Sequence, residues 1–103
     1  MSDTILTLHP QGKKGVNISK DKYDVIKTAI FNTLQTQGPM SHTELTNQVN
    51  LALGSSFNGS VPWYVTTVKL DLEARGAIER ISGTRPEQLQ LIAAKSAGIA
   101  GLI

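Results

Sequence analysis

The residues of this chain best suited to bind another molecule are hydroxyl and amine side chains in the segment 60–75. Val65, Val68 and Leu72 recur there at three and four residues, which predicts a helix with one inward apolar stripe. The positions left outward can contact phosphate groups or the edges of bases. These candidate binding residues are Ser60, Tyr64, Thr66, Thr67 and Lys69.

Three further candidate binding residues, all of them basic, lie outside this segment. Lys13 and Lys14 are flanked by glycines, so they are predicted to lie in a loop. The pair is interpreted either as a solvated turn or as a basic arm that contacts a phosphate backbone. Arg85 lies in a predicted turn rich in Gly, Thr and Pro, where an arginine can contact phosphate or enter a minor groove.

Catalytic and metal-binding chemistry is not indicated by the sequence. The chain has no cysteine and 2 histidines, His9 and His42, which lie in different segments without an evident acid partner. Gly12-Lys13-Lys14 lacks the first glycine and the hydroxyl of a nucleotide-binding phosphate loop. We therefore expect no enzyme activity, no cofactor, no metal site and no small-molecule ligand.

Composition is that of a globular chain. The 103 residues suit one domain, and 40% of them are hydrophobic and 17% charged. A net charge of +2 permits nucleic-acid binding without requiring it. The absence of cysteine fits a reducing cytoplasm. The sequence has no long apolar run, so neither a signal peptide nor a membrane span is expected.

Two helices are expected before the 60–75 segment. The first should span 20–37, with Ser19 as its N-cap, and should end at Gly38-Pro39. Its inward stripe should be Tyr23, Ile26, Ile30 and Leu34, widened by Val25, Ala29 and Phe31. The second should begin at Ser41, where Ser41 and Glu44 form a capping box. Its inward residues should be Leu45, Val49 and either Ala52 or Leu53.

The third helix should span 61–75, with Ser60 as N-cap and Gly76 as the left-handed stop. Strands are expected at 77–81 and 88–92, joined by a turn at 82–87, and a short strand or arm at 4–8. This predicts an N-terminal arm with a basic loop at 1–19, a core domain at 20–92 and a tail at 93–103. The apolar tail can form a short helix, pack on the arm or stay mobile.

Three helices followed by a two-stranded hairpin give an α+β fold of the winged helix-turn-helix type. The run SHTELTNQV followed by VPWYVTTVKLDLEARGAIERISGTRPEQLQL resembles winged-helix proteins. Together with HPQGKKGVNISKDKYDVIKTAI, it is similar to a small family of uncharacterised bacterial winged-helix proteins. The resemblance covers His9 to Ile92 and implies the fold, and most often DNA binding, but it carries no catalytic or ligand residues.

Two functions follow as hypotheses. The first is a regulator-like domain that contacts duplex DNA through the third helix and the wing. The second is a protein-interaction or dimerisation module that uses Tyr64, the wing and the apolar tail, with a second copy of the chain as the most plausible partner. Asp71 and Glu73 on the third helix nearly balance Lys69 and Arg75, so the electrostatic case for DNA depends mainly on Arg85 and the Lys13–Lys14 loop.

Overall fold

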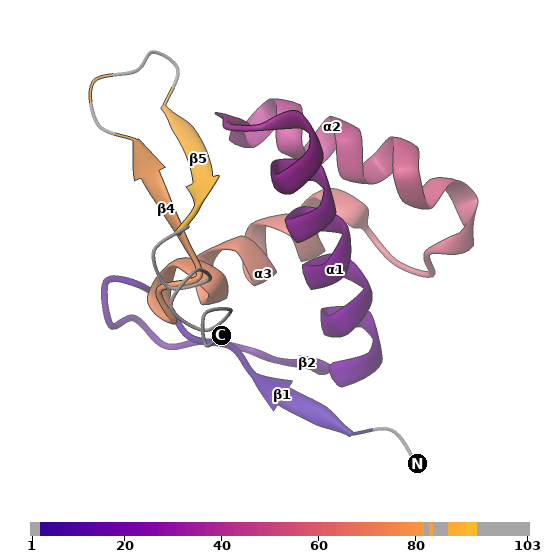
Figure 1. Cartoon of the computed structure of the whole chain (residues 1–103). Coiled ribbons are helices and arrows are strands. Elements are labelled where there is room, and N and C mark those ends of the chain that lie inside the picture. The colour runs from indigo at the N-terminus through magenta and orange to yellow at the C-terminus, as the bar shows by residue number, and fades with distance from the viewer. Residues whose placement is uncertain (1–2, 82, 84–86, 93–103) are drawn as a thin grey trace, which may run out of the picture.

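A computed structural model describes residues 3–81, 83 and 87–92 of the chain. Within them, three helices pack around one core and a small antiparallel sheet covers one end (Figure 1). The helices are α1 (Lys20–Gln37), α2 (His42–Leu53) and α3 (Val61–Ala74), with a short 3₁₀ turn, η1 (Gly54–Ser56), after α2. The α+β fold is therefore confirmed, and the arrangement is winged-helix-like.

The helix ends follow the predicted capping residues. Ser19 accepts the backbone N–H of Lys22 at the start of α1, and Ser60 accepts that of Trp63 at the start of α3. At α2 the capping box is complete, since Ser41 accepts the Glu44 N–H and the Glu44 carboxylate accepts the Ser41 N–H. Gly76 has a positive φ of 79°, as expected for a left-handed stop after α3.

The wing is a three-stranded sheet in the order β3-β5-β4. Strands β4 (Ile78–Ile81) and β5 (Gln88–Leu91) form the predicted hairpin. Strand β3 (Met40–Ser41) lies between α1 and α2 and pairs with β5 through Met40 and Leu89. The sequence did not predict β3, because two residues are too few to establish an alternating pattern.

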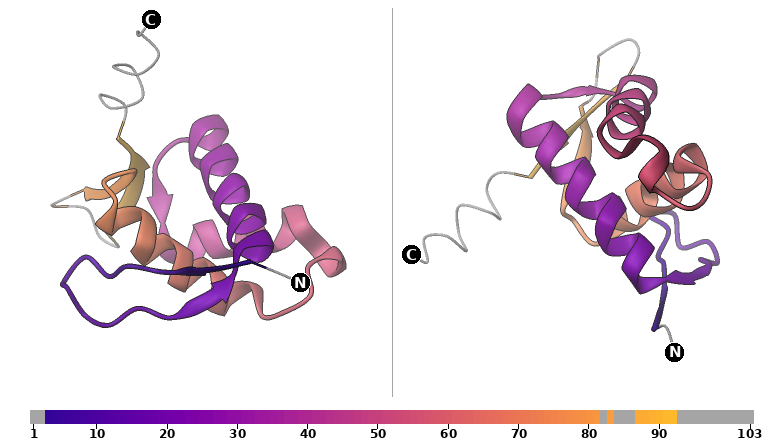
Figure 2. Two further views of the ribbon diagram at one scale, coloured as in Figure 1. Left: turned by 90° about the horizontal axis from the view of Figure 1, so that it is seen from below. Right: turned by 90° about the vertical axis from the view of Figure 1, so that its right-hand side faces the viewer.

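The N-terminal arm is a strand pair. Strand β1 (Thr4–Leu6) runs antiparallel to β2 (Asn17–Ser19), and Thr7 extends the pairing by donating its backbone N–H to Val16. The loop between the strands extends beside the C-terminal end of α3 (Figure 2, left). A short strand or arm was predicted at 4–8, whereas no strand was predicted at β2.

The core is built from one apolar stripe of each helix and from the sheet. Its buried side chains include Ile26 and Ile30 of α1, Leu45 and Val49 of α2, Val65 and Leu72 of α3, Ile78 of β4 and Leu89 of β5. Burying a side chain of this size stabilises the fold by about 1.5–3 kcal/mol. One predicted inward residue is wrong, since Val25 is 44% exposed. Of the alternatives Ala52 and Leu53, Leu53 packs against the core and Ala52 is exposed. Val25 and Ala52 lie beside a groove between α1 and α2 rather than in the core.

Candidate interaction surface

Helix α3 presents three different rows of side chains. One row is buried against the other helices and contains Val61, Val65, Val68 and Leu72. A second row, at 62, 66, 69 and 73, lies beside the start of α2 and the wing. The third row is Trp63, Thr67, Leu70 and Ala74, which are exposed or half-buried. Because residues three and four apart share a helix face, this third row forms a continuous uncharged surface.

The prediction that Lys69 faces outward is wrong. Its residue exposure is 8%, and its ammonium group lies 3.3 Å from a carboxylate oxygen of Glu73, one turn further along α3. The other Glu73 oxygen accepts the Arg80 guanidinium of β4 at 2.8 Å. Arg80 also lies 3.4 Å from Glu87. Both cations of this cluster are thus paired with carboxylates, so a phosphate group would have to compete with Glu73 and Glu87 for them.

Thr66 of α3 and His42 of α2 are in contact next to this cluster, where α3 lies beside the start of α2. The Thr66 hydroxyl donates to the Pro62 carbonyl in its own helix and lies 3.3 Å from His42 Nε2. His42 Nδ1 is buried and has no hydrogen-bond partner among the described residues. Burial, together with the nearby cations Lys69 and Arg80, lowers the pKa of His42. The neutral imidazole therefore adds no positive charge to this surface near neutral pH.

The start of α3 is occupied by an aromatic cluster. The Tyr64 ring packs edge-on against Phe57 at 5.2 Å and Trp63 at 4.9 Å between ring centroids. The Lys22 ammonium lies 5.5 Å from the Tyr64 centroid, a cation–π geometry that holds this lysine against the protein. Ser60 already uses its hydroxyl oxygen as the helix cap. The predicted binding residue Tyr64 is half-buried in this cluster, whereas Trp63, which was not predicted to bind, is 47% exposed.

Lys13 and Lys14 are exposed, as expected, but they lie at the other end of α3. They line a hollow together with Leu6, Leu8 and Ala74, the last residue of the helix. An α-helix rises about 1.5 Å per residue, so the 14 residues of α3 separate this loop from Ser60 by about 20 Å. The Ile81 end of β4 also points away from the arm (Figure 1). Arg85 lies outside the described residues.

Asp71 is the polar residue that sequence reasoning misjudged most. It was counted as a helix surface charge, but it is fully buried. Its carboxylate accepts the Leu8 backbone N–H, the Tyr23 hydroxyl and the Arg75 guanidinium. Burial and this carboxylate raise the pKa of Tyr23, so the tyrosine hydroxyl remains a donor. An aspartate one turn before an arginine at the helix end was the only sequence signal for this cluster.

Charge is distributed unevenly along the chain. From Thr28 to Val68 the sole aspartate, glutamate, lysine or arginine is Glu44, which forms the capping box of α2. This stretch contains the C-terminal half of α1, all of α2 and the first half of α3. Its exposed side chains are chiefly Thr, Asn, Gln and Ser, with Leu51 and Trp63 as exposed large apolar residues. We call this part of the surface the uncharged helical face.

Two properties of the described residues concern metal ions and membranes. No group of three or more His, Asp or Glu side chains in residues 3–81, 83 and 87–92 is placed to hold a metal ion. In the same part of the chain, every helix is too short or too polar to cross a membrane.

Comparison with known proteins gives one relationship. No curated protein and no solved structure matches the chain. A protein-family model does match residues 4–89, which extends from β1 to β5 and includes every described residue of the candidate surface. The chain therefore belongs to the family of unknown function DUF6958.

Proposed function

We propose that this domain is a protein-interaction module, and that its partner surface is the uncharged helical face. The observation that carries the proposal is the state of the charged residues around α3. Lys69 is buried against Glu73, Arg80 is paired with Glu73 and Glu87, and Asp71 is internal. The centres of protein–protein interfaces are depleted of charge and enriched in aromatic residues. The row that begins at Trp63 has this character.

Reading of DNA by α3 is disfavoured by the same residues. Proteins bind duplex DNA largely by neutralising phosphates with lysine and arginine, and guanine is most often read by arginine. The exposed and half-buried positions of the third row of α3 are Trp63, Thr67, Leu70 and Ala74, which carry no cation. Thr66 is exposed, but its hydroxyl already bonds to Pro62 and lies beside His42.

Trp63 allows a direct test, because it is the single tryptophan of the chain and lies on α3. We would titrate a labelled random duplex while recording the anisotropy of the DNA and the emission of Trp63. The proposal expects Trp63 emission to stay constant even if the duplex binds. A Trp63 change that follows DNA binding, and is weakened by replacing both Thr66 and Thr67 with alanine, would place α3 against the DNA and overturn the proposal.

Duplex DNA remains a second candidate partner, as the resemblance to winged-helix proteins suggests, because Lys13 and Lys14 are exposed on a projecting loop. Binding by these residues would be through phosphates and independent of sequence. Each neutralised phosphate contributes about −0.9 to the slope of log K against log salt, so a Lys13→Gln/Lys14→Gln variant should reduce the slope by about two. Lys20→Gln is the matched control, since Lys20 already pairs with Asp24. A salt-independent affinity would argue against this candidate.

This proposal assigns no catalytic activity to the domain. It also retains the cytoplasmic location predicted from the cysteine-free sequence.

A further inference from the structure

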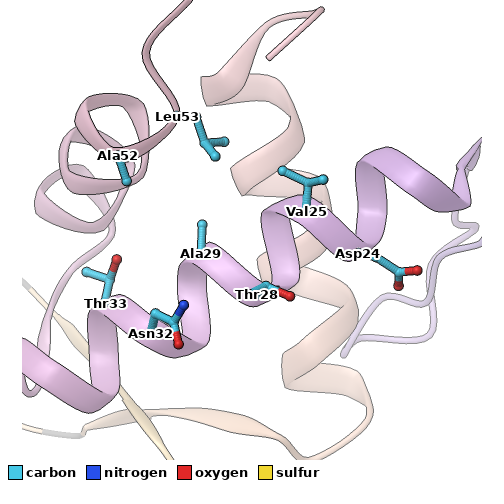
Figure 3. A pocket seen from close by; sticks show the side chains of 8 residues that line it. All are labelled: Asp24, Val25, Thr28, Ala29, Asn32, Thr33, Ala52 and Leu53. Carbon is cyan, nitrogen blue, oxygen red and sulfur yellow. The ribbon is translucent and has the colours of Figure 1, made fainter. Parts of the chain in front are cut away.

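A groove between α1 and α2 lies at the edge of the uncharged helical face, and its lining extends beyond that face to Asp24 and Val25. Val25 and Ala29 of α1 lie opposite Ala52 and Leu53 of α2, and these four apolar side chains form its floor (Figure 3). Thr28, Asn32 and Thr33 add uncharged polar groups to the lining, and Asp24 points away from the floor. The groove has a volume of about 470 Å³, within the usual size range of binding sites in proteins.

An apolar side chain that could fill such a groove is present on the same face. Leu51 is 77% exposed, the highest value among the large apolar residues in the part of the chain that the structure describes. Gln48 of α2 accepts a hydrogen bond from the Gln37 side chain of α1, which places Gln48 on the α1 side of α2. Leu51 does not line the groove itself; it lies one helical turn after Gln48 and directly precedes Ala52, so it projects into solvent from the turn of α2 that borders the groove.

These features are self-complementary. In a dimer with two-fold symmetry, the same patch is used on both subunits, and a side chain near the axis faces its own copy. Charged residues near the axis would therefore repel each other. Between Thr28 and Val68 the chain has no lysine or arginine, and Glu44 is held in the capping box; Asp24, which lines one end of the groove, is paired with Lys20. In such a dimer the protruding leucine of each copy can pack into the apolar groove of the other copy, so the same contact is made twice in one interface.

We propose that two copies of this chain form a symmetric dimer in which Leu51 of each copy occupies the α1–α2 groove of the other. The inference depends on the proposed function, since it identifies a second copy as the protein partner. Leu51 would contact Val25 and Ala29 of the partner. Burial of both leucines and both groove floors would remove two exposed apolar residues, Leu51 and Val25, from water in each copy.

Sedimentation from low to high micromolar concentration tests the dimer. The wild-type chain should change from monomer to dimer over this range. Leu51→Asp should raise the dissociation constant about tenfold or more, because the dimer loses two buried leucines and would bury two carboxylates. Val25→Lys tests the groove side independently, because it places a charge in the groove and should also raise the dissociation constant. Leu6→Asp is the matched control, since Leu6 is an exposed leucine (55%) on the arm, and it should leave the dimer unchanged. Circular dichroism would establish that each variant is folded.

Cysteine cross-linking provides a second measurement, because the natural chain has no cysteine. An oxidised mixture of Leu51→Cys and Thr28→Cys chains should give the mixed disulfide, whereas Leu6→Cys with Thr28→Cys should not. A strict monomer, or a dimer weakened by Leu6→Asp and not by Leu51→Asp, would overturn the inference. Neither result bears on the Trp63 titration, so the dimer and the broader proposal can fail separately.

Discussion

The carboxylate of Asp71, near the end of α3, accepts the backbone N–H of Leu8 at 2.8 Å, although the two residues are 63 positions apart. The same carboxylate accepts the Tyr23 hydroxyl of α1 and, at 2.8 Å, the Arg75 guanidinium. One buried side chain therefore joins the N-terminal arm, the first helix and the third helix. This contact makes the arm part of the folded domain and holds its lysine loop beside the end of α3.

Replacing Asp71 should weaken this junction. Asp71→Asn removes the charge that holds three donors, and hydrogen bonds to charged groups contribute about 1.5–3 kcal/mol each. Because the Arg75 side chain is 42% exposed and can be rehydrated, and because the asparagine oxygen still accepts one of the other two donors, we expect a total loss of about 2–3 kcal/mol in the free energy of unfolding. Chemical denaturation measures this. Asp24→Asn is the control, because the Lys20–Asp24 pair is exposed to solvent and should contribute little to stability. Equal losses for both variants would contradict the junction.

Glu73 should be needed to compensate the charge of Lys69. The Lys69 side chain is 10% exposed and the Glu73 side chain is 8% exposed. Little water could therefore solvate the Lys69 ammonium group if the Glu73 carboxylate were removed. Breaking a buried ion pair by removing one member typically costs about 3–5 kcal/mol, so Glu73→Gln should be strongly destabilising. Adding Lys69→Met should restore much of the stability. Glu87→Gln is the matched control, because Glu87 is 55% exposed at its contact with Arg80. A harmless Glu73→Gln variant would show that Lys69 reaches solvent.

His42 should make folding sensitive to mild acid. An unfolded histidine has a pKa of about 6.5, and burial beside Lys69 and Arg80, opposed by Glu73, lowers the pKa of His42 in the folded chain. Below about pH 6.5 the unfolded chain therefore takes up a proton more readily than the folded chain, so stability falls as the pH decreases toward the folded pKa.

Denaturation at a series of pH values from about 8 to 5 measures this effect. His42→Gln should flatten the dependence in this window. His9→Gln removes the other histidine, on the arm, and should leave most of the dependence in place. The assignment to His42 would be wrong if both variants retained the wild-type slope.

Glycine should be required at position 15 for the two strands of the arm, β1 and β2, to pair. A Cβ atom at this position would lie 1.7 Å from the carbonyl oxygen of Thr7, which belongs to the backbone and cannot rotate away. Gly15→Ala should therefore separate the Thr7–Val16 pairing and increase amide hydrogen exchange across β1 and β2, with a smaller effect in α1–α3. Val16→Ala keeps the backbone and serves as control, since Val16 is 40% exposed. Unchanged protection at Thr7 in the Gly15 variant would exclude this role.

Local sequence signals determined the helices. Ser19, Ser41 and Ser60 cap the helices that they were predicted to cap, because a cap acts on amides only two or three residues away. The three- and four-residue spacing of apolar residues likewise identified most of the core. The same approach missed β2 and β3, since strands of two or three residues depend on pairing with distant segments and not on their own pattern.

Contacts between distant segments decided the character of the candidate surface. Lys69 and Asp71 look like solvent-exposed charges in a helical sequence, and only packing against α2, the wing and the arm places them inside. Val25 and Ala52 look like core residues, yet the relative position of α1 and α2 leaves them beside the groove. The sequence by itself determined where helices start and which stripe they bury, because those properties arise within a few turns. Which charges stay available, and where an apolar groove remains open, was decided only by tertiary structure, since both depend on partners far away in the chain.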